Sequence, residues 1–236
     1  MNIVDFVILG VLGISVLFGL YKGFINSILG LVGVFAALVI AYSAYPQLAK
    51  TLQADDSLIR TLAHYSDAAS RVGDLDLART PVANISPQVL NDIMSRAALP
   101  EPFDSFVREN IAKLAFSSTG GGTVSDYLNQ TIIAVSLNIL CFLLCFAVAY
   151  AVITLLAHLL HYVFRMPVLK HFDLLLGAVF GGIRGVFLVF VLFALVPILI
   201  TVSPITEVAE LVEQSRFAGV FAQNSLIQSI MQGTLF

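Results

Sequence analysis

The sequence has little charge for its length. Only 11% of its 236 residues are charged and 58% are hydrophobic, whereas soluble domains contain about 25% charged and about 45–50% apolar residues. A soluble protein with this composition would lack the polar surface needed to cover its core. The composition therefore predicts an integral membrane protein whose main partner is the lipid bilayer.

Positive charge is scarce and scattered. The net charge is −3, and the twelve Lys and Arg residues form no basic cluster. Because nucleic-acid-binding proteins gather basic residues on one face or stripe, we expect no nucleic acid partner.

Residues that could hold a metal or a cofactor are equally few. Cys141 and Cys145 are four residues apart in an apolar run, a spacing that puts them on one helix face, where a disulfide is geometrically poor. His158 and His161 share a helix face but have no third ligand nearby. The sequence contains no nucleophile elbow, phosphate loop, HExxH or Cys-x-x-Cys motif. We therefore predict no enzyme activity, no cofactor and no metal site.

Four apolar stretches are long enough to cross a membrane, which takes about 17–25 residues. Residues 3–20 and 24–42 flank the short turn GLYKG, residues 131–164 contain a third span at about 132–156, and residues 174–202 form the fourth. The first stretch carries Asp5 where a signal peptide would have basic residues, and it has no clear cleavage site. It is predicted to be a retained helix that forms a hairpin with the second.

Residues 46–130 have a different composition. They hold seven of the twelve basic residues, ten of the fifteen acidic residues and five of the eight prolines. Segments 57–70, 86–98 and 104–116 show helical spacing of apolar positions, with Ser86 and Asp104 as candidate N-caps. We predict a small helical subdomain or helices lying on the membrane, with a loosely ordered loop as the alternative.

The predicted fold class is an all-α membrane protein. It comprises a hairpin at 1–45, the polar insert at 46–130, two spans within 131–202, and an amphipathic helix in the tail at 203–236 that lies on the membrane or folds back against the insert. The short loops around Lys22 and around Arg165 and Lys170 are basic. By the positive-inside rule these loops are cytoplasmic, which places both termini and the insert outside.

Glycines recur at helix-packing spacing within the spans. Gly177, Gly181 and Gly185 are four residues apart, Gly30 and Gly33 lie in the second span, and Gly19 and Gly23 border the first turn. Small residues let membrane helices approach closely. These positions are candidates for helix packing, within the chain or in an oligomer, or for lining a pore.

Arg184 is the one basic residue deep in a predicted span. On a continuous helix it lies about 16 Å beyond Asp173, near mid-bilayer, where a charge costs roughly 2.5–3.5 kcal/mol on insertion scales. It should then face the bundle and meet a carboxylate, carbonyl groups or water. In the alternative, residues 172–183 form an interfacial or re-entrant segment, and Arg184 is a cytoplasmic-side anchor.

The pattern resembles the bacterial colicin V production (CvpA) family. The resemblance is carried by the opening N-x-x-D, by the turn GLYKGF, and by Asp173 followed by LLLGAVFGGIRGVFLV. The positions that match the family's motifs are Asn2, Asp5, Gly19, Lys22, Gly23, Asp173, Gly177, Gly181, Arg184 and Gly185. The resemblance implies a multi-pass protein of the bacterial cytoplasmic (inner) membrane that is linked to colicin V production or export, with no settled biochemical activity.

Two functions fit these observations. The first is an accessory or scaffold protein in toxin production, secretion or envelope processes, held to a second copy or to a partner span by its glycine faces. The second is a small oligomeric channel with Arg184 near the pore, for which an anion preference would follow from the charge. Acidic residues inside the spans are missing apart from Asp5, and no inverted repeat is evident, so a conventional transporter is poorly supported.

Overall fold

The computed structural model describes residues 2–66, 72–99, 103–116, 122–161, 170–202, 210–212, 214–222 and 225–233. Within these residues the fold is all-helical, as the composition predicts, and the sole strand-like feature is an isolated bridge between Pro81 and Thr123. The helices are α1 (Ile3–Gln53), α2 (Asp56–Ser66), α4 (Leu75–Ala78), η1 (Val82–Asn84), α5 (Pro87–Ala97), α6 (Phe103–Ala112), α7 (Val124–His161), α8 (Lys170–Phe193), α9 (Val196–Val202), α11 (Ala218–Ala222) and α12 (Ser225–Gln232).

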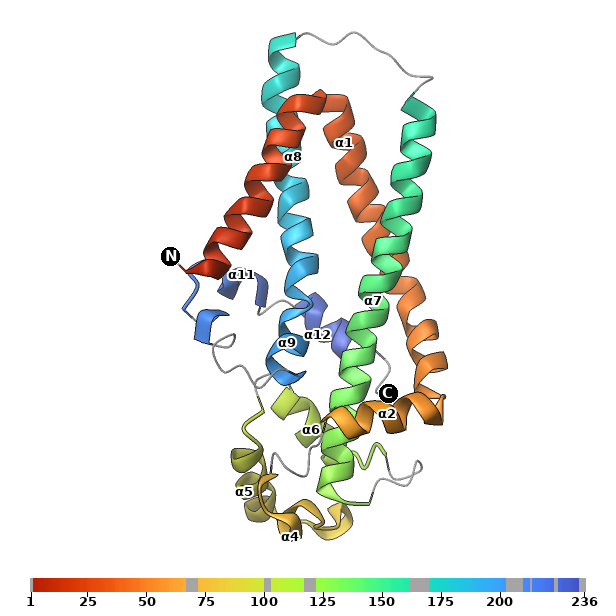
Figure 1. The fold of residues 1–236 in the computed structure, drawn as a ribbon, viewed down its shortest axis with the longest axis vertical. Helices are drawn as coiled ribbons and strands as arrows, with labels where there is room; N and C mark the ends of the chain where they lie inside the picture. Colours follow the sequence, from red (N-terminus) through yellow and green to blue (C-terminus); the bar gives the residue numbers. More distant parts are fainter. Residues whose placement is uncertain are drawn as a thin grey trace. The chain divides into compact units, whose positions relative to one another are not determined.

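Helix α1 is a hairpin. Gly23, the last residue of the predicted turn, has φ 79° and ψ 177°, a conformation that is essentially restricted to glycine. The chain reverses within α1 in Figure 1, so this helix has a first arm before Gly23 and a second arm after it. Three helical regions are long and apolar enough to cross a membrane: α1, residues 124–158 of α7, and residues 173–200 of α8 and α9.

The chain divides into two compact units. Unit 1 consists of Met1–Tyr45, Phe142–Val196 and Ile205–Asn224, and unit 2 consists of Pro46–Cys141, Pro197–Pro204 and Ser225–Phe236. Helices α1 and α7 therefore each contribute to both units. In α7 the helix begins seven residues before the predicted start of the third apolar stretch, and its first half belongs to the core of unit 2.

Large apolar side chains are exposed along the long helices. They fall within residues 3–21 and 29–42 of α1, residues 140–156 of α7 and residues 174–192 of α8. Contiguous apolar surface on this scale is unusual for a soluble monomer. It is the surface expected of helices that face lipid.

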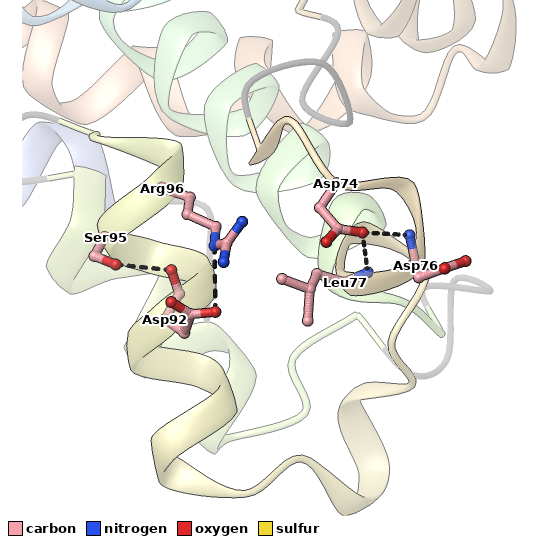
Figure 2. Close-up of polar contacts among 6 residues, drawn as sticks. All are labelled: Asp74, Asp76, Leu77, Asp92, Ser95 and Arg96. Atoms are coloured by element: carbon pink, nitrogen blue, oxygen red, sulfur yellow. Dashed lines mark hydrogen bonds and ion pairs between the residues drawn. The ribbon is translucent and has the colours of Figure 1, made fainter.

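Unit 2 contains the helices of the polar insert. Side chains that are fully buried there include Ile93, Phe103, Val107, Tyr127 and Leu128. The start of α4 is capped locally (Figure 2), because Asp74 accepts hydrogen bonds from the backbone N–H groups of Asp76 and Leu77. The described part of the insert is thus a helical core.

The two candidate caps in the insert have different outcomes. Ser86 caps α5, since its side chain accepts from Val89 N. Asp104 instead lies in the first turn of α6, which begins at Phe103, and it pairs with Arg108.

The described tail forms two short helices, α11 and α12. Helix α11 belongs to unit 1, where Ala218 is buried. Helix α12 belongs to unit 2, where Ile227, Ile230 and Met231 are buried. Asn138 of α7 donates a 2.9 Å hydrogen bond to the Met231 carbonyl. The predicted tail residues Glu207, Val208 and Glu213, and Arg165 in the loop before α8, lie outside the described residues.

The hairpin turn generates a prediction. Gly23→Ala should destabilise the protein by about 1–3 kcal/mol, because a side chain disfavours this backbone conformation and its Cβ would overlap the Asp173 carboxylate. Unfolding in mixed micelles measures the change in stability. Gly219→Ala is the control, since Gly219 also lies in unit 1 and a Cβ there meets nothing within 4 Å. Equal stability of the two variants would contradict the hairpin geometry.

Candidate functional site

The first feature of unit 1 is a contact between glycines, which we term the glycine seam and define as Gly19, Gly177 and Gly181. A Cβ on Gly181 would lie 2.6 Å from the Ser15 carbonyl oxygen and 3.0 Å from Gly19 Cα, and a Cβ on Gly19 would overlap the Gly177 carbonyl. Real Cβ atoms essentially never come this close. The backbones of the first arm of α1 and of α8 therefore touch, which requires glycine at these positions.

A hydrogen bond reinforces the seam. Ser15 Oγ donates to the Gly181 carbonyl over 2.7 Å, and Ser15 is buried. One turn further along α8, a Cβ on Gly185 would lie 2.9 Å from Ser15 Cβ. The predicted glycine face of α8 is thus filled by its own chain.

Asp173 closes the hairpin turn. Phe24 N–H, at the start of the second arm, donates a 2.7 Å hydrogen bond to Asp173 Oδ1. The first N–H groups of a helix have no partner within the helix, and a carboxylate is stabilised by the dipole there. The rings of Phe24 and Phe180 meet edge to face with centroids 5.4 Å apart. The start of α8 is therefore fastened to the turn of α1.

Asn2 and Asp5 fasten the start of α1 to the tail. Asn2 Oδ1 accepts from the N–H groups of Val4 and Asp5, which caps the helix. The buried Asp5 carboxylate accepts from Ser215 Oγ at 2.6 Å and from Arg216 N at 3.1 Å. Asn2 Nδ2 also donates to the Leu211 carbonyl.

Ser215 was not predicted from the sequence. Its hydroxyl accepts from Ala218 N at 3.1 Å and so begins α11. A serine three residues before a short helix is an N-cap signal. Nothing in the sequence, however, indicates that this cap would meet Asp5.

The second feature is a cavity of about 630 Å³ between both arms of α1, α7 and α8, which we term the cationic cavity. Lys22 and Arg184 line it and share one aromatic ring, with Lys22 Nζ 4.5 Å and Arg184 Cζ 4.8 Å from the centroid of Phe18. The Arg184 side chain also lies against Gly30, since a Cβ on Gly30 would be 3.0 Å from Arg184 Nη1. Arg184 Nε is buried and has no hydrogen-bond partner.

Neither acidic residue considered for Arg184 meets it. Asp5 is bonded to the tail and Asp173 to the hairpin turn. Helix α8 runs without a break through Gly181 and Gly182, so Asp173 and Arg184 stay eleven residues apart on one helix. Arg184 lies instead over the Phe18 ring and beside Gly30.

The remaining candidates lie around these features. Gly33 packs α1 against α7, where a Cβ would lie 3.3 Å from Ile153 Cγ2. His158 lines the cavity and its Nδ1 pairs with the Thr154 carbonyl at 2.8 Å, while the side chain of His161 is outside the described part. Cys141 and Cys145 are not joined in a disulfide. Over the described ranges no three His, Cys, Asp or Glu side chains gather as a metal site would require.

Comparison with known proteins gives one result. The family model described as Colicin V production protein matches residues 4–72 and 114–226, which include the hairpin, the seam, the cavity and Ser215. Much of the insert, residues 73–113, falls outside the match. No curated protein and no solved structure matches the chain.

The contact between Asp5 and the tail generates a prediction. Asp5→Ala should raise the rate of tryptic cleavage after Arg216 about tenfold or more, because two hydrogen bonds to a charged group, each worth roughly 1.5–3 kcal/mol, are lost. Cleavage of the detergent-solubilised protein, followed by mass spectrometry, measures the rate. Asp5→Asn keeps the accepting Oδ1 and should stay much closer to the unaltered protein. An Asp5→Ala protein cleaved at the original rate would show that this contact does not hold the tail.

Proposed function

The chain belongs to the colicin V production protein family, and from that premise we propose that it is a four-span protein of the bacterial cytoplasmic membrane. In this proposal it acts as an accessory or scaffold in toxin production and secretion or in envelope processes, and not as an enzyme.

The exposed apolar surface supports four spans. The exposed side chains of the first arm of α1 and of α8 extend over residues 3–21 and 174–192, about 28 Å each at 1.5 Å per residue, close to the roughly 30 Å of a bilayer core. In the second arm the exposed apolar side chains extend over residues 29–42, within the apolar stretch 24–42. In α7 the exposed residues begin at Leu140, so we place the third span at 140–161 instead of 132–156.

The distribution of charge supports the orientation. Lys22 lies in the hairpin turn. Helix α8 begins at Lys170, three residues before Asp173, whose carboxylate accepts a hydrogen bond from Phe24 N–H at that turn. Basic residues near span ends favour the cytoplasmic side. The hairpin turn is then cytoplasmic, and both termini and the polar insert are outside.

The main support for the scaffold role is that the family-motif residues join segments of the chain to one another. Asn2, Asp5 and Asp173 make hydrogen bonds that join segments of the chain, and the seam glycines bring helix backbones together. These residues build a fixed helix arrangement, as a scaffold requires.

Assembly with a second copy or a partner span needs a different glycine face. The face of Gly177, Gly181 and Gly185 is filled from within the chain. Gly10 and Gly13 in the first arm meet nothing within 4 Å, so we propose that this part of α1 receives the partner helix.

A complementation experiment tests the role in toxin release. In a bacterial strain that carries the colicin V genes but lacks its own member of this family, the chain should restore release of active toxin. Gly181→Leu should not, because the seam cannot close around a larger side chain. Gly122→Leu is the matched control, since a Cβ at Gly122 meets nothing within 4 Å. If the unaltered chain reaches the membrane but toxin release stays at the level of the deleted strain, the proposed role in toxin release is wrong.

The second candidate function is a small oligomeric channel, which the position of Arg184 in a cavity favours. In this case Arg184→Glu in lipid vesicles would change anion flux through the reconstituted protein. A flux that equals that of protein-free vesicles, both before and after the substitution, would leave only the scaffold role.

A further inference from the structure

We propose that the cationic cavity is a binding site for a phosphate-bearing anion, in which Lys22 and Arg184 hold the phosphate oxygens. This proposal concerns ligand binding alone and does not depend on a role in toxin release.

The cavity carries positive charge that nothing in it balances. Lys22 and Arg184 both line it, and no carboxylate does so among the lining residues described. Each of the two cations lies over the Phe18 ring, whose electron-rich face attracts a positive charge. Both side chains are only partly exposed, and a cation removed from water needs a counter-charge and hydrogen bonds to offset its desolvation, so two cations on one ring favour a bound anion.

The hydrogen-bonding groups around the cations point to the same conclusion. The amide of Asn26 donates to the Lys22 carbonyl, and the Thr154 hydroxyl donates to the Tyr150 carbonyl. In contrast, Arg184 Nε is buried and unpaired. The charged donors of the cavity are the guanidinium and the ammonium, beside the hydroxyls of Tyr21 and Tyr150 and the ring of His158, and a planar guanidinium matches the spacing of phosphate oxygens.

The cavity extends from the hairpin turn along the second arm, since Lys22, Gly30 and Gly33 all line it. Lys22 lies in the turn, whereas Arg184 Nη1 lies beside Gly30, which is seven residues after Gly23 and about 10 Å from it along the helix. Side chains of a helix tilt toward its N-terminus, so Arg184 reaches from α8 back toward the turn. The two charges thus lie in the part of the cavity between the hairpin turn and Gly30.

Size distinguishes an organic phosphate from a bare ion. The volume of about 630 Å³ lies within the range of roughly 300–1,000 Å³ typical of small-molecule sites. Leu29 and Ile153 add apolar walls. A phospholipid headgroup with its glycerol would use both the charge and the apolar wall, whereas inorganic phosphate would use the charge alone.

Ligand-dependent thermal stability of the full-length protein in an uncharged detergent tests the proposal. The probes are short-chain phosphatidylglycerol, inorganic phosphate, and short-chain diacylglycerol as the uncharged analogue. Phosphatidylglycerol should raise the unfolding temperature in a saturable way, and diacylglycerol should not. The apparent affinity should fall about tenfold or more in Arg184→Gln, and also in Lys22→Gln, since hydrogen bonds to charged groups contribute roughly 1.5–3 kcal/mol. Lys50→Gln removes an exposed cation outside the cavity and should have no effect.

Comparing the probes identifies the source of the phosphate. Saturation by phosphatidylglycerol, without competition from inorganic phosphate, assigns the site to a lipid headgroup. Stabilisation by inorganic phosphate that is lost in the same two variants assigns it to a free phosphate.

Two results would overturn the proposal. One is that neither phosphatidylglycerol nor inorganic phosphate stabilises the unaltered protein. The other is that Lys50→Gln weakens binding as much as Lys22→Gln does. Lys22→Gln keeps the test valid if Arg184→Gln does not fold. If the unaltered protein binds neither phosphate-bearing probe but restores toxin release, only this binding site is refuted. If it binds a probe but does not restore toxin release, only the proposed function is refuted.

Discussion

The contact between the backbones of the first arm of α1 and α8 is the constraint on which the rest of unit 1 depends. Helices in lipid gain little from burying apolar side chains against one another, so close packing and hydrogen bonds hold them together. Gly19, Gly177 and Gly181 provide the close approach, and Ser15 adds a hydrogen bond across it. With these backbones in contact, Asp173 reaches the hairpin turn, and Arg184 is directed into the cavity.

The polar residues of unit 1 then divide into two groups. The acidic residues join segments of the chain by hydrogen bonds, since Asp173 closes the hairpin turn and Asp5 holds the tail through Ser215. The basic group, Lys22 and Arg184, is left facing a cavity with an aromatic ring as its shared contact. This separation explains why a chain with so little charge keeps a cation within an apolar helix: the acids that could have neutralised it are bonded elsewhere.

Local patterns in the sequence predicted the helices, but not which of them meet. Apolar length predicted the long helices, the short connection GLYKG between two apolar stretches predicted the reversal, and Ser86 predicted the start of α5. Spacing predicted that Gly177 and Gly181 share a face, although it could not show whether that face meets Gly19 of the same chain or a second copy. The meeting of Asp5 with Ser215, 210 residues away, depends on tertiary structure and leaves no local signal.

Cross-linking across the seam tests this account most directly. Ser15→Cys with Gly185→Cys, in a chain carrying Cys141→Ser and Cys145→Ser, brings two Cβ atoms within reach of a disulfide. A Cβ on Gly185 would lie 2.9 Å from Ser15 Cβ, so the two helices need to separate by only about 0.6 Å to reach the lower end of the roughly 3.5–4.5 Å between Cβ atoms in disulfides. Mild oxidation in native membranes should yield a monomer with an internal disulfide. Cross-linked dimers in place of that monomer, or free thiols at both positions, would contradict a seam formed within one chain.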